Sequence, residues 1–264
     1  MSQIEIVDVA IDYKRPKSDY VFTAIQGITL SVDKGSFVTI VGSSGCGKST
    51  LLLAIAGLIP RARGSIRVDG RDVAGPGRDR AMVFQDASLL PWRSVHGNVR
   101  FGLELQRWRR DDVEARVARF IEMVGLSKFA DYHPHQLSGG MRQRVNIARA
   151  LAVDPDVLLL DEPLAALDAQ TREVMGNELL RIWERDKKTA LFVTHAIDEA
   201  IFLGDKVVVM GRNPGHIKDI VEIDLPRPRT VAMLDSAAFI AYRRTLRDYI
   251  AADLQSMPMI EDAA

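Results

Sequence analysis

The chain has 264 residues, of which 47% are apolar and 27% are charged, and these proportions exclude a disordered chain and allow a sizeable core. Its 35 lysines and arginines balance 35 aspartates and glutamates, so the formal net charge is zero. This balance excludes the basic surplus that drives non-specific binding to nucleic acid or anionic lipid, and we expect no nucleic-acid partner.

The first third of the chain alternates β-rich runs with polar turns, including a turn at residues 14–19. Isoleucine and valine recur between polar residues in these runs, which is typical of half-buried strands. An apolar segment at residues 49–58 is expected to form a helix that ends at Gly57 and Pro60. We expect strands at residues 4–11, 27–32, 37–41, 65–68 and 81–84.

The loop between the strand at 37–41 and the following helix reads G-S-S-G-C-G-K-S. Its glycines allow backbone amides to curl around an anion, and the helix start adds the positive end of its dipole. This pattern, in this context, predicts a phosphate-binding loop of a nucleotide site. Lys48 is expected to reach the β- and γ-phosphates, and the Ser49 hydroxyl to ligate Mg²⁺. The predicted nucleotide contacts are Gly42, Ser43, Ser44, Gly45, Cys46, Gly47, Lys48, Ser49 and Thr50.

Cys46 is the single cysteine, so no intrachain disulfide is expected and a reducing cytoplasm fits. The first residues lack the basic segment and apolar core of a signal peptide. The longest apolar stretch, residues 51–60, is far shorter than the roughly 20 residues that span a bilayer. We therefore expect a protein that meets a membrane only through a partner.

The periodicity becomes helical at residues 95–131, which indicates a helical insertion in a β-rich frame. Farther along, strands and helices alternate, which is typical of a parallel sheet covered by helices. These segments are 157–160, 171–186, 190–194, 197–203 and 206–210. Residues 225–229 are expected to form an extended linker, and residues 238–254 a final amphipathic helix.

Two carboxylates follow the apolar strand at 157–160 directly. Ligands of parallel sheets bind beyond the carboxyl ends of the strands, so Asp161 is expected to hold Mg²⁺. Glu162 is then placed to polarise the attacking water as general base.

Residues 137–144 read L-S-G-G-M-R-Q-R. Ser138 is expected to cap a helix that runs to Leu151, and Gly139 and Gly140 let its first amides face an anion. The chain thus has two phosphate-binding helix starts, which favours a head-to-tail pair of chains sharing each ATP. This stretch resembles the signature of the ATP-binding cassette (ABC) transporter family, in which Gln is commoner than Met at position 141.

The resemblance implies roles for further residues. Gln85 matches a glutamine that contacts Mg²⁺ or the attacking water and faces the permease, and His195 matches a histidine that contacts the γ-phosphate. Leu167 and Asp168 match the end of a loop with a role between subunits. Ala165 and Ala196 depart from the commoner Ser and Asp.

An aromatic residue that stacks on adenine is also expected from the resemblance. Tyr13 matches it best, because it lies just before the polar turn and the second strand. Tyr20 and Phe22 are the competing candidates.

The resemblance covers about residues 3–230 and implies an α/β fold of the P-loop NTPase (RecA-like) class. A mostly parallel core sheet is expected, with an antiparallel β subdomain and an inserted α-helical subdomain at about 95–150. We divide the chain accordingly into an ATP-binding domain, residues 1–230, and a C-terminal helical extension, residues 231–264.

Within the family, the sequence looks closest to the branch that energises nitrate, sulfonate and taurine uptake. The supporting stretches are 89–92, 171–172 with 182–183, 197–200, 214–215 and 225–229. This implies an ATPase with ATP and Mg²⁺ as cofactors, peripheral to the cytoplasmic side of the inner membrane. Implied partners are integral-membrane permease subunits, a solute-binding protein and a second copy of this chain. An exporter or a non-transport ATPase of the same fold is the alternative.

The apolar residues 89–92 follow Gln85 closely. We interpret residues 85–92 as part of a groove for a permease helix. A small core cluster is the competing interpretation.

Overall fold

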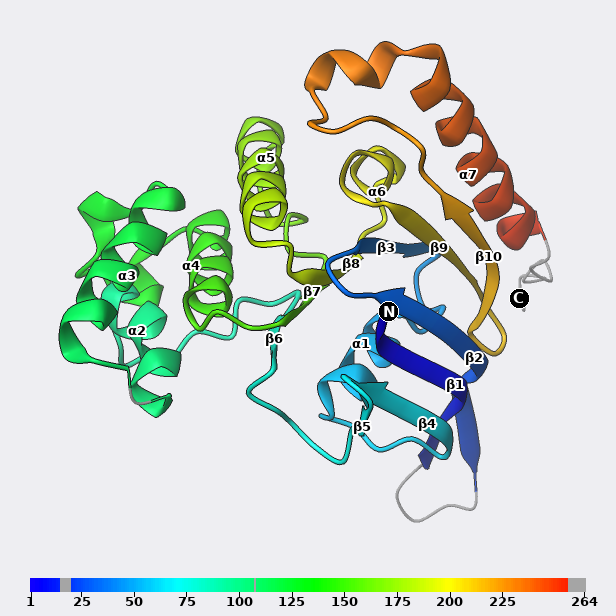
Figure 1. Ribbon diagram of the computed structural model, residues 1–264, viewed down its shortest axis with the longest axis horizontal. Coiled ribbons are helices and arrows are strands. Elements are labelled where there is room, and N and C mark those ends of the chain that lie inside the picture. The colour runs from blue at the N-terminus through cyan, green and yellow to red at the C-terminus, as the bar shows by residue number, and fades with distance from the viewer. Residues whose placement is uncertain (15–19, 107, 256–264) are drawn as a thin grey trace, which may run out of the picture.

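Two sheets form the frame of the computed structural model, which describes residues 1–14, 20–106 and 108–255 (Figure 1). The smaller sheet is antiparallel and has the order β2-β1-β4-β5. Its strands are β1 (Ser2–Lys14), β2 (Val21–Asp33), β4 (Arg63–Val68) and β5 (Arg71–Asp72). Most of the predicted turn at 14–19 lies outside the described residues.

The larger sheet has the order β10-β9-β3-β8-β7-β6 and is parallel except for the β9–β10 pair. Its strands are β3 (Phe37–Gly42), β6 (Arg80–Val83), β7 (Val157–Asp161), β8 (Thr189–Val193), β9 (Lys206–Gly211) and β10 (His216–Glu222). Every residue of β3, β7 and β8 is buried, as expected for strands covered on both faces.

Successive side chains of a strand point to opposite faces, and this alternation divides the core in two. Val157 and Leu159 pack with α1 (Lys48–Ala56) and the antiparallel sheet. Leu158 and Leu160 pack on the other face with α4 (Gly139–Ala152) and α5 (Ala169–Asp186).

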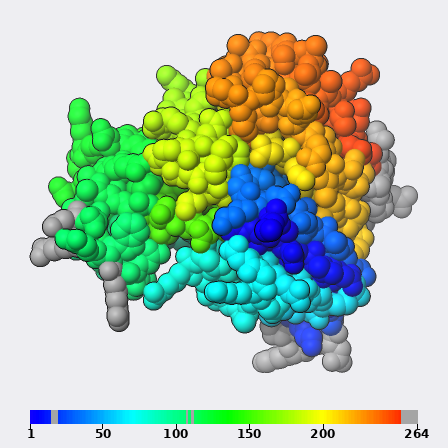
Figure 2. All heavy atoms as spheres, in the orientation of Figure 1, coloured from blue at the N-terminus to red at the C-terminus, as the bar shows by residue number. Residues whose placement is uncertain are grey.

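The predicted helical insertion forms a lobe beside the sheets, drawn in green in Figures 1 and 2. It contains α2 (Val95–Leu105), α3 (Arg110–Met123) and α4, with two short 3-10 helices, η1 (Ser127–Phe129) and η2 (Pro134–Gln136). The apolar residues that the sequence places at helical spacing are all buried: Val113, Val117, Phe120, Ile121 and Val124. Their packing confirms the helical periodicity of this segment.

The last part of the chain returns to the large sheet. It contains α6 (Ile197–Leu203), η3 (Val231–Asp235) and α7 (Ala237–Gln255), and α7 packs on α6 and β9 through Phe239 and Leu246. Strands β5 and β10 and the first half of β2 were not predicted. The residues of the predicted C-terminal extension beyond 255 lie outside the described part. Within residues 1–14, 20–106 and 108–255, no helix combines the length and apolarity needed to cross a bilayer.

Candidate functional site

The predicted phosphate-binding loop connects β3 to α1, and its glycines adopt the conformation that the pattern requires. Gly45 and Gly47 have φ values of 80° and 91°, in the left-handed region that favours glycine. A Cβ atom at Gly47 would lie 2.3 Å from Cγ2 of Ile25, so only glycine fits there. Gly47 is also the N-cap of α1, and no side chain caps this helix start. The first amides of α1 are therefore without a side-chain cap, which suits a site for an external anion.

Lys48 is only 7% exposed and lies against its own loop. Its Nζ donates hydrogen bonds to the backbone oxygens of Gly42, at 2.9 Å, and of Ser43, at 3.1 Å. The Ser43 hydroxyl in turn accepts a hydrogen bond from Nε of Arg212 at 2.6 Å. Sequence reasoning missed Arg212, whose only signal was its place directly after a strand of the parallel sheet. Two cationic side chains thus support the loop.

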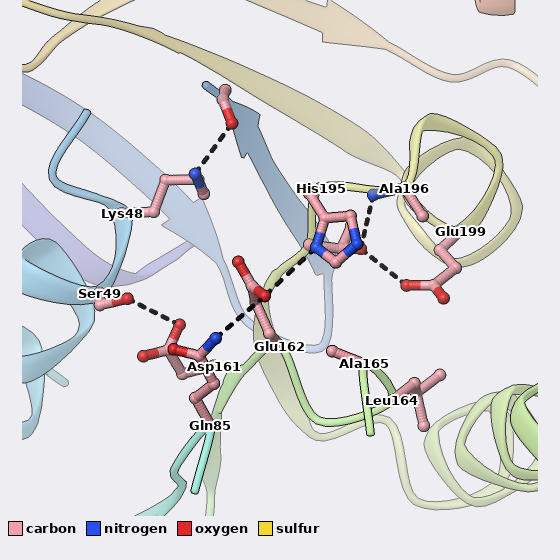
Figure 3. A network of polar contacts seen from close by, with 12 residues as sticks. Lys48, Ser49, Gln85, Asp161, Glu162, Leu164, Ala165, His195, Ala196 and Glu199 are labelled. Carbon is pink, nitrogen blue, oxygen red and sulfur yellow. Dashed lines mark hydrogen bonds and ion pairs between the residues drawn. The ribbon is translucent and has the colours of Figure 1, made fainter. Parts of the chain in front are cut away.

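The candidate metal ligands Ser49 and Asp161 are brought together by the packing of α1 on β7. Ser49 Oγ donates to Asp161 Oδ1 at 3.0 Å (Figure 3). Burial raises the pKa of Asp161; the hydrogen bond from Ser49 lowers it, and the charge of Glu162 raises it further. A buried carboxylate beside a hydroxyl offers the oxygen ligands that Mg²⁺ prefers. Among the described residues, no group of three or more His, Cys, Asp or Glu side chains is placed to hold a metal ion.

The three candidate catalytic residues meet at the carboxyl ends of neighbouring parallel strands (Figure 3). Gln85 follows β6, Glu162 follows β7 and His195 follows β8. Glu162 Oε2 accepts a hydrogen bond from Gln85 Nε2 at 3.4 Å and lies 3.2 Å from His195 Nδ1. The Glu162 side chain is 18% exposed, whereas that of His195 is 63% exposed. A mostly buried carboxylate that is oriented by two side chains can accept a proton from a water in front of it.

A cavity of about 270 Å³ lies between Gln85, Glu162, the phosphate-binding loop and the antiparallel sheet, and neither Asp161 nor His195 lines it. Tyr13 and Phe22, which pair across β1 and β2, line it together. Tyr20 is not among its lining residues. Of the three aromatic candidates, the structure therefore brings two to the cavity. The other lining residues are Ala24, Ser44, Gly45, Gly47, Lys48, Ser49, Thr50, Gln85 and Glu162.

The second predicted anion-binding helix start lies elsewhere. Ser138 is the N-cap of α4, and its Oγ accepts a hydrogen bond from the amide of Met141 at 3.2 Å. Ser138 and Gly139 are exposed, and neither they nor Gly140 line the cavity beside the loop. Because α4 and α1 pack on opposite faces of β7, one chain does not bring the two helix starts to a single site.

Comparisons with known proteins show which proteins this chain resembles. Residues 25–165 match the family model described as ABC transporter. The chain is 46% identical to a taurine import ATP-binding protein of Rhizobium johnstonii, over 91% of this chain and 92% of that protein. It is 43% identical to a nitrate import ATP-binding protein of Synechococcus elongatus, over 90% of this chain and 88% of that protein. Among solved structures, a dimeric ATP-binding cassette in a post-hydrolysis state, bound to ADP and Pi, matches with a TM-score of 0.77 and 30% identity, covering 84% of this chain and all of that chain.

Proposed function

The chain belongs to the ABC transporter family of ATP-binding proteins, and from this premise we propose that it is the ATP-hydrolysing subunit of an importer. The names of its taurine and nitrate import relatives support a small anionic or zwitterionic solute. The observation that carries the proposal is that Lys48, Ser49 and Glu162 line one cavity, while Asp161 accepts a hydrogen bond from Ser49.

Each side chain has a chemical task in this proposal. The loop amides and Lys48 hold the phosphates, and Tyr13 or Phe22 stacks on the adenine. Glu162 takes a proton from the attacking water as the oxygen–phosphorus bond forms and the bond to the ADP oxygen breaks. Gln85 and His195 hold the Glu162 carboxylate in place.

The proposed metal is Mg²⁺, held by Ser49 and Asp161 with Gln85 as a further ligand. When bound, it neutralises negative charge on the β- and γ-phosphates. The Ser49–Asp161 hydrogen bond of 3.0 Å supports this ligand pair, because both oxygens already face each other.

Two copies of the chain are proposed to sandwich ATP head to tail. The exposure of Ser138 and Gly139, outside the cavity of their own chain, supports a role toward another molecule. The dimeric cassette that matches the chain also supports it. In such a dimer, ATP binding stabilises the closed pair and hydrolysis releases it.

The partner is proposed to be an integral-membrane permease on whose cytoplasmic face the chain docks, with a solute-binding protein completing the system. Leu89 packs against the core, whereas Trp92 is 71% exposed, so the apolar stretch after Gln85 is core at one end and open surface at the other. An exposed tryptophan is a typical anchor of a protein interface. Crosslinking from position 92 in native membranes tests this docking: a permease adduct is expected, and its consistent absence contradicts the placement.

Glu162→Gln tests the whole proposal. The variant retains every group that binds ATP but lacks the base, so it is expected to form a stable dimer with ATP and Mg²⁺ and to lose turnover. Gel filtration with and without ATP measures the dimer, and phosphate release measures turnover. Glu122→Gln, on the exposed face of α3, is the matched control and should behave as the unmodified chain. A Glu162→Gln protein that stays monomeric and hydrolyses ATP normally would refute the assignment.

A further inference from the structure

Arg172 lies in the first turn of α5 and holds the turn that follows Glu162. Its Nη2 donates hydrogen bonds to the backbone oxygens of Leu167, at 3.0 Å, and Ala165, at 3.4 Å. Its Nε donates to the backbone oxygen of Leu164 at 3.3 Å. The amide of Ala165 also donates to the backbone oxygen of Glu162 at 3.2 Å, so this turn begins at the candidate base itself. One guanidinium therefore holds the backbone turn that follows Glu162.

The same guanidinium also reaches the segment that carries His195. Nε of Arg172 lies 3.7 Å from Oε1 of Glu199 on α6. The other carboxylate oxygen of Glu199 accepts a hydrogen bond from the Thr194 hydroxyl at 2.7 Å, and that hydroxyl accepts one from the amide of Ala196 at 3.0 Å (Figure 3). Thr194 is 2% exposed. These bonds fix the backbone on both sides of His195.

The contact between His195 and Glu162, at 3.2 Å, closes this chain of interactions into a ring. We propose that Arg172 is a positioning residue for hydrolysis, which sets the Glu162 carboxylate and the His195 imidazole relative to each other. This inference rests on the proposed role of Glu162 as base. Arg172 does not line the cavity beside the phosphate loop, so it acts through the turn and through Glu199 and not on the nucleotide.

The geometry suits positioning better than stabilisation of the fold. The side chain of Arg172 is 36% exposed, and an ion pair of that exposure contributes little to stability. A planar guanidinium can donate hydrogen bonds to several acceptors at once in a fixed geometry. The single ammonium group of a lysine cannot do this. A small displacement of a catalytic group, in contrast, has a large effect on the rate.

The first test compares Arg172→Ala with Arg181→Ala in the full chain. Arg181 lies on the same helix, its side chain is 72% exposed, and it pairs with Glu178 on its own helix. For Arg172→Ala we expect kcat to fall about ten- to a hundredfold. The KM for ATP should change by less than about twofold, because the nucleotide contacts are intact. Arg181→Ala should match the unmodified chain in both constants, and all proteins should share one unfolding temperature.

The second test asks whether Arg172→Lys restores part of kcat and whether the effects of Arg172 and Glu199 on kcat are coupled. Arg172→Lys should recover part of the lost kcat, since an ammonium can pair with Glu199 but cannot replace the fork to the three carbonyls. Glu199→Gln should lower kcat by a smaller factor, and the double variant Arg172→Ala/Glu199→Gln should lose less than the product of the two factors. Fully multiplicative losses would show that the two residues do not act through one ring and would overturn the proposal.

Failure of this inference and failure of the proposed function give different results. If Glu162→Gln is inactive while Arg172→Ala keeps a normal kcat, positioning by Arg172 is wrong and the function stands. If Glu162→Gln itself hydrolyses ATP normally, both are wrong. If Arg172→Ala lowers the unfolding temperature and raises KM together with the loss of kcat, the residue is structural and the inference is overturned.

Discussion

The chain contains two glycine-rich helix starts, at α1 and at α4, and they differ in local structure. At α1 the N-cap is Gly47, in the left-handed region and without a side-chain cap, and the adjacent Lys48 is 7% exposed. At α4 the N-cap is Ser138, in an extended conformation, and its hydroxyl accepts from the amide of Met141. Gly139, the first residue of α4, is exposed.

This difference separates a candidate site that lies within one chain from a surface that, in the proposed dimer, contacts the nucleotide of a second chain. The α1 start has a cation beside it, and Glu162 and Tyr13 line the same cavity. The residues of the α4 start have no part in that cavity. We therefore expect changes at α1 to impair nucleotide binding by a single chain, and changes at α4 to impair only what happens between two chains.

The largest effect is expected for Lys48→Ala. Loss of a charged hydrogen-bond donor should lower the ATP affinity of the single chain roughly ten- to a hundredfold. Equilibrium binding of a fluorescent ATP analogue, at a protein concentration where the chain is monomeric, measures it. Lys128→Ala, at an exposed position in η1, is the control and should bind normally. If Lys48→Ala binds ATP with unchanged affinity, the α1 start is not the nucleotide site and the contrast with α4 is wrong.

An intermediate effect is expected for Gly139→Asp in the Glu162→Gln background. A carboxylate at the start of α4 would repel the triphosphate held by the other chain, whereas Gly139→Asn adds the same bulk without charge. The nearest atom to a Cβ atom at this position would be Nη2 of Arg142, at 3.9 Å, so both variants should fold. We expect the Asp variant to weaken the ATP-dependent dimer about tenfold more than the Asn variant.

Analytical ultracentrifugation with ATP and Mg²⁺ measures this difference between the Asp and Asn variants. The ATP affinity of the single chain should be the same for both. Equal dimer stability in the two variants would mean that no phosphate lies near the start of α4, and the head-to-tail arrangement would be wrong.

The smallest effect is expected for Ser138→Ala, which removes the cap of α4. The free energy of unfolding should fall by about 1 kcal/mol, and by only a few tenths for Ser138→Gly. Denaturant titration of the monomer without nucleotide measures both. The α1 start has no such cap to lose, since Gly47 has no side chain, so this cost should be specific to α4. Equal stability of all three proteins would show that the Ser138 hydrogen bond contributes nothing.

Much of the fold could be predicted because its signals are local. Buried parallel strands such as β7 are continuous aliphatic runs, and the helical period of α3 places its apolar residues on one face. Strand β10 was missed because its residues are alternately exposed and half-buried and several are charged. Its strand conformation depends on pairing with β9, which no local pattern indicates.

The candidate site likewise contains residues that the sequence could identify and contacts that it could not. The loop glycines with Lys48 and the acids after β7 could be identified from sequence, because residue type and spacing define them locally. The sequence could not show that Phe22 shares the cavity with Tyr13, because this depends on the register between β1 and β2. Arg212 is 169 residues from Ser43, and its hydrogen bond arises only because β9 lies beside β3.

By itself, the sequence determined which candidate groups this protein carries: a loop of the phosphate-binding pattern, Ser49 and Asp161 as candidate Mg²⁺ ligands, Glu162 as the candidate base, and a second glycine-rich helix start. Only the tertiary structure decided which groups meet. Glu162 contacts His195 and Gln85, and Arg172 connects the two sides of that cluster, because the order of β6, β7 and β8 brings three strand ends together. Backbone preferences act over a few residues, whereas these contacts depend on the packing of whole strands and helices.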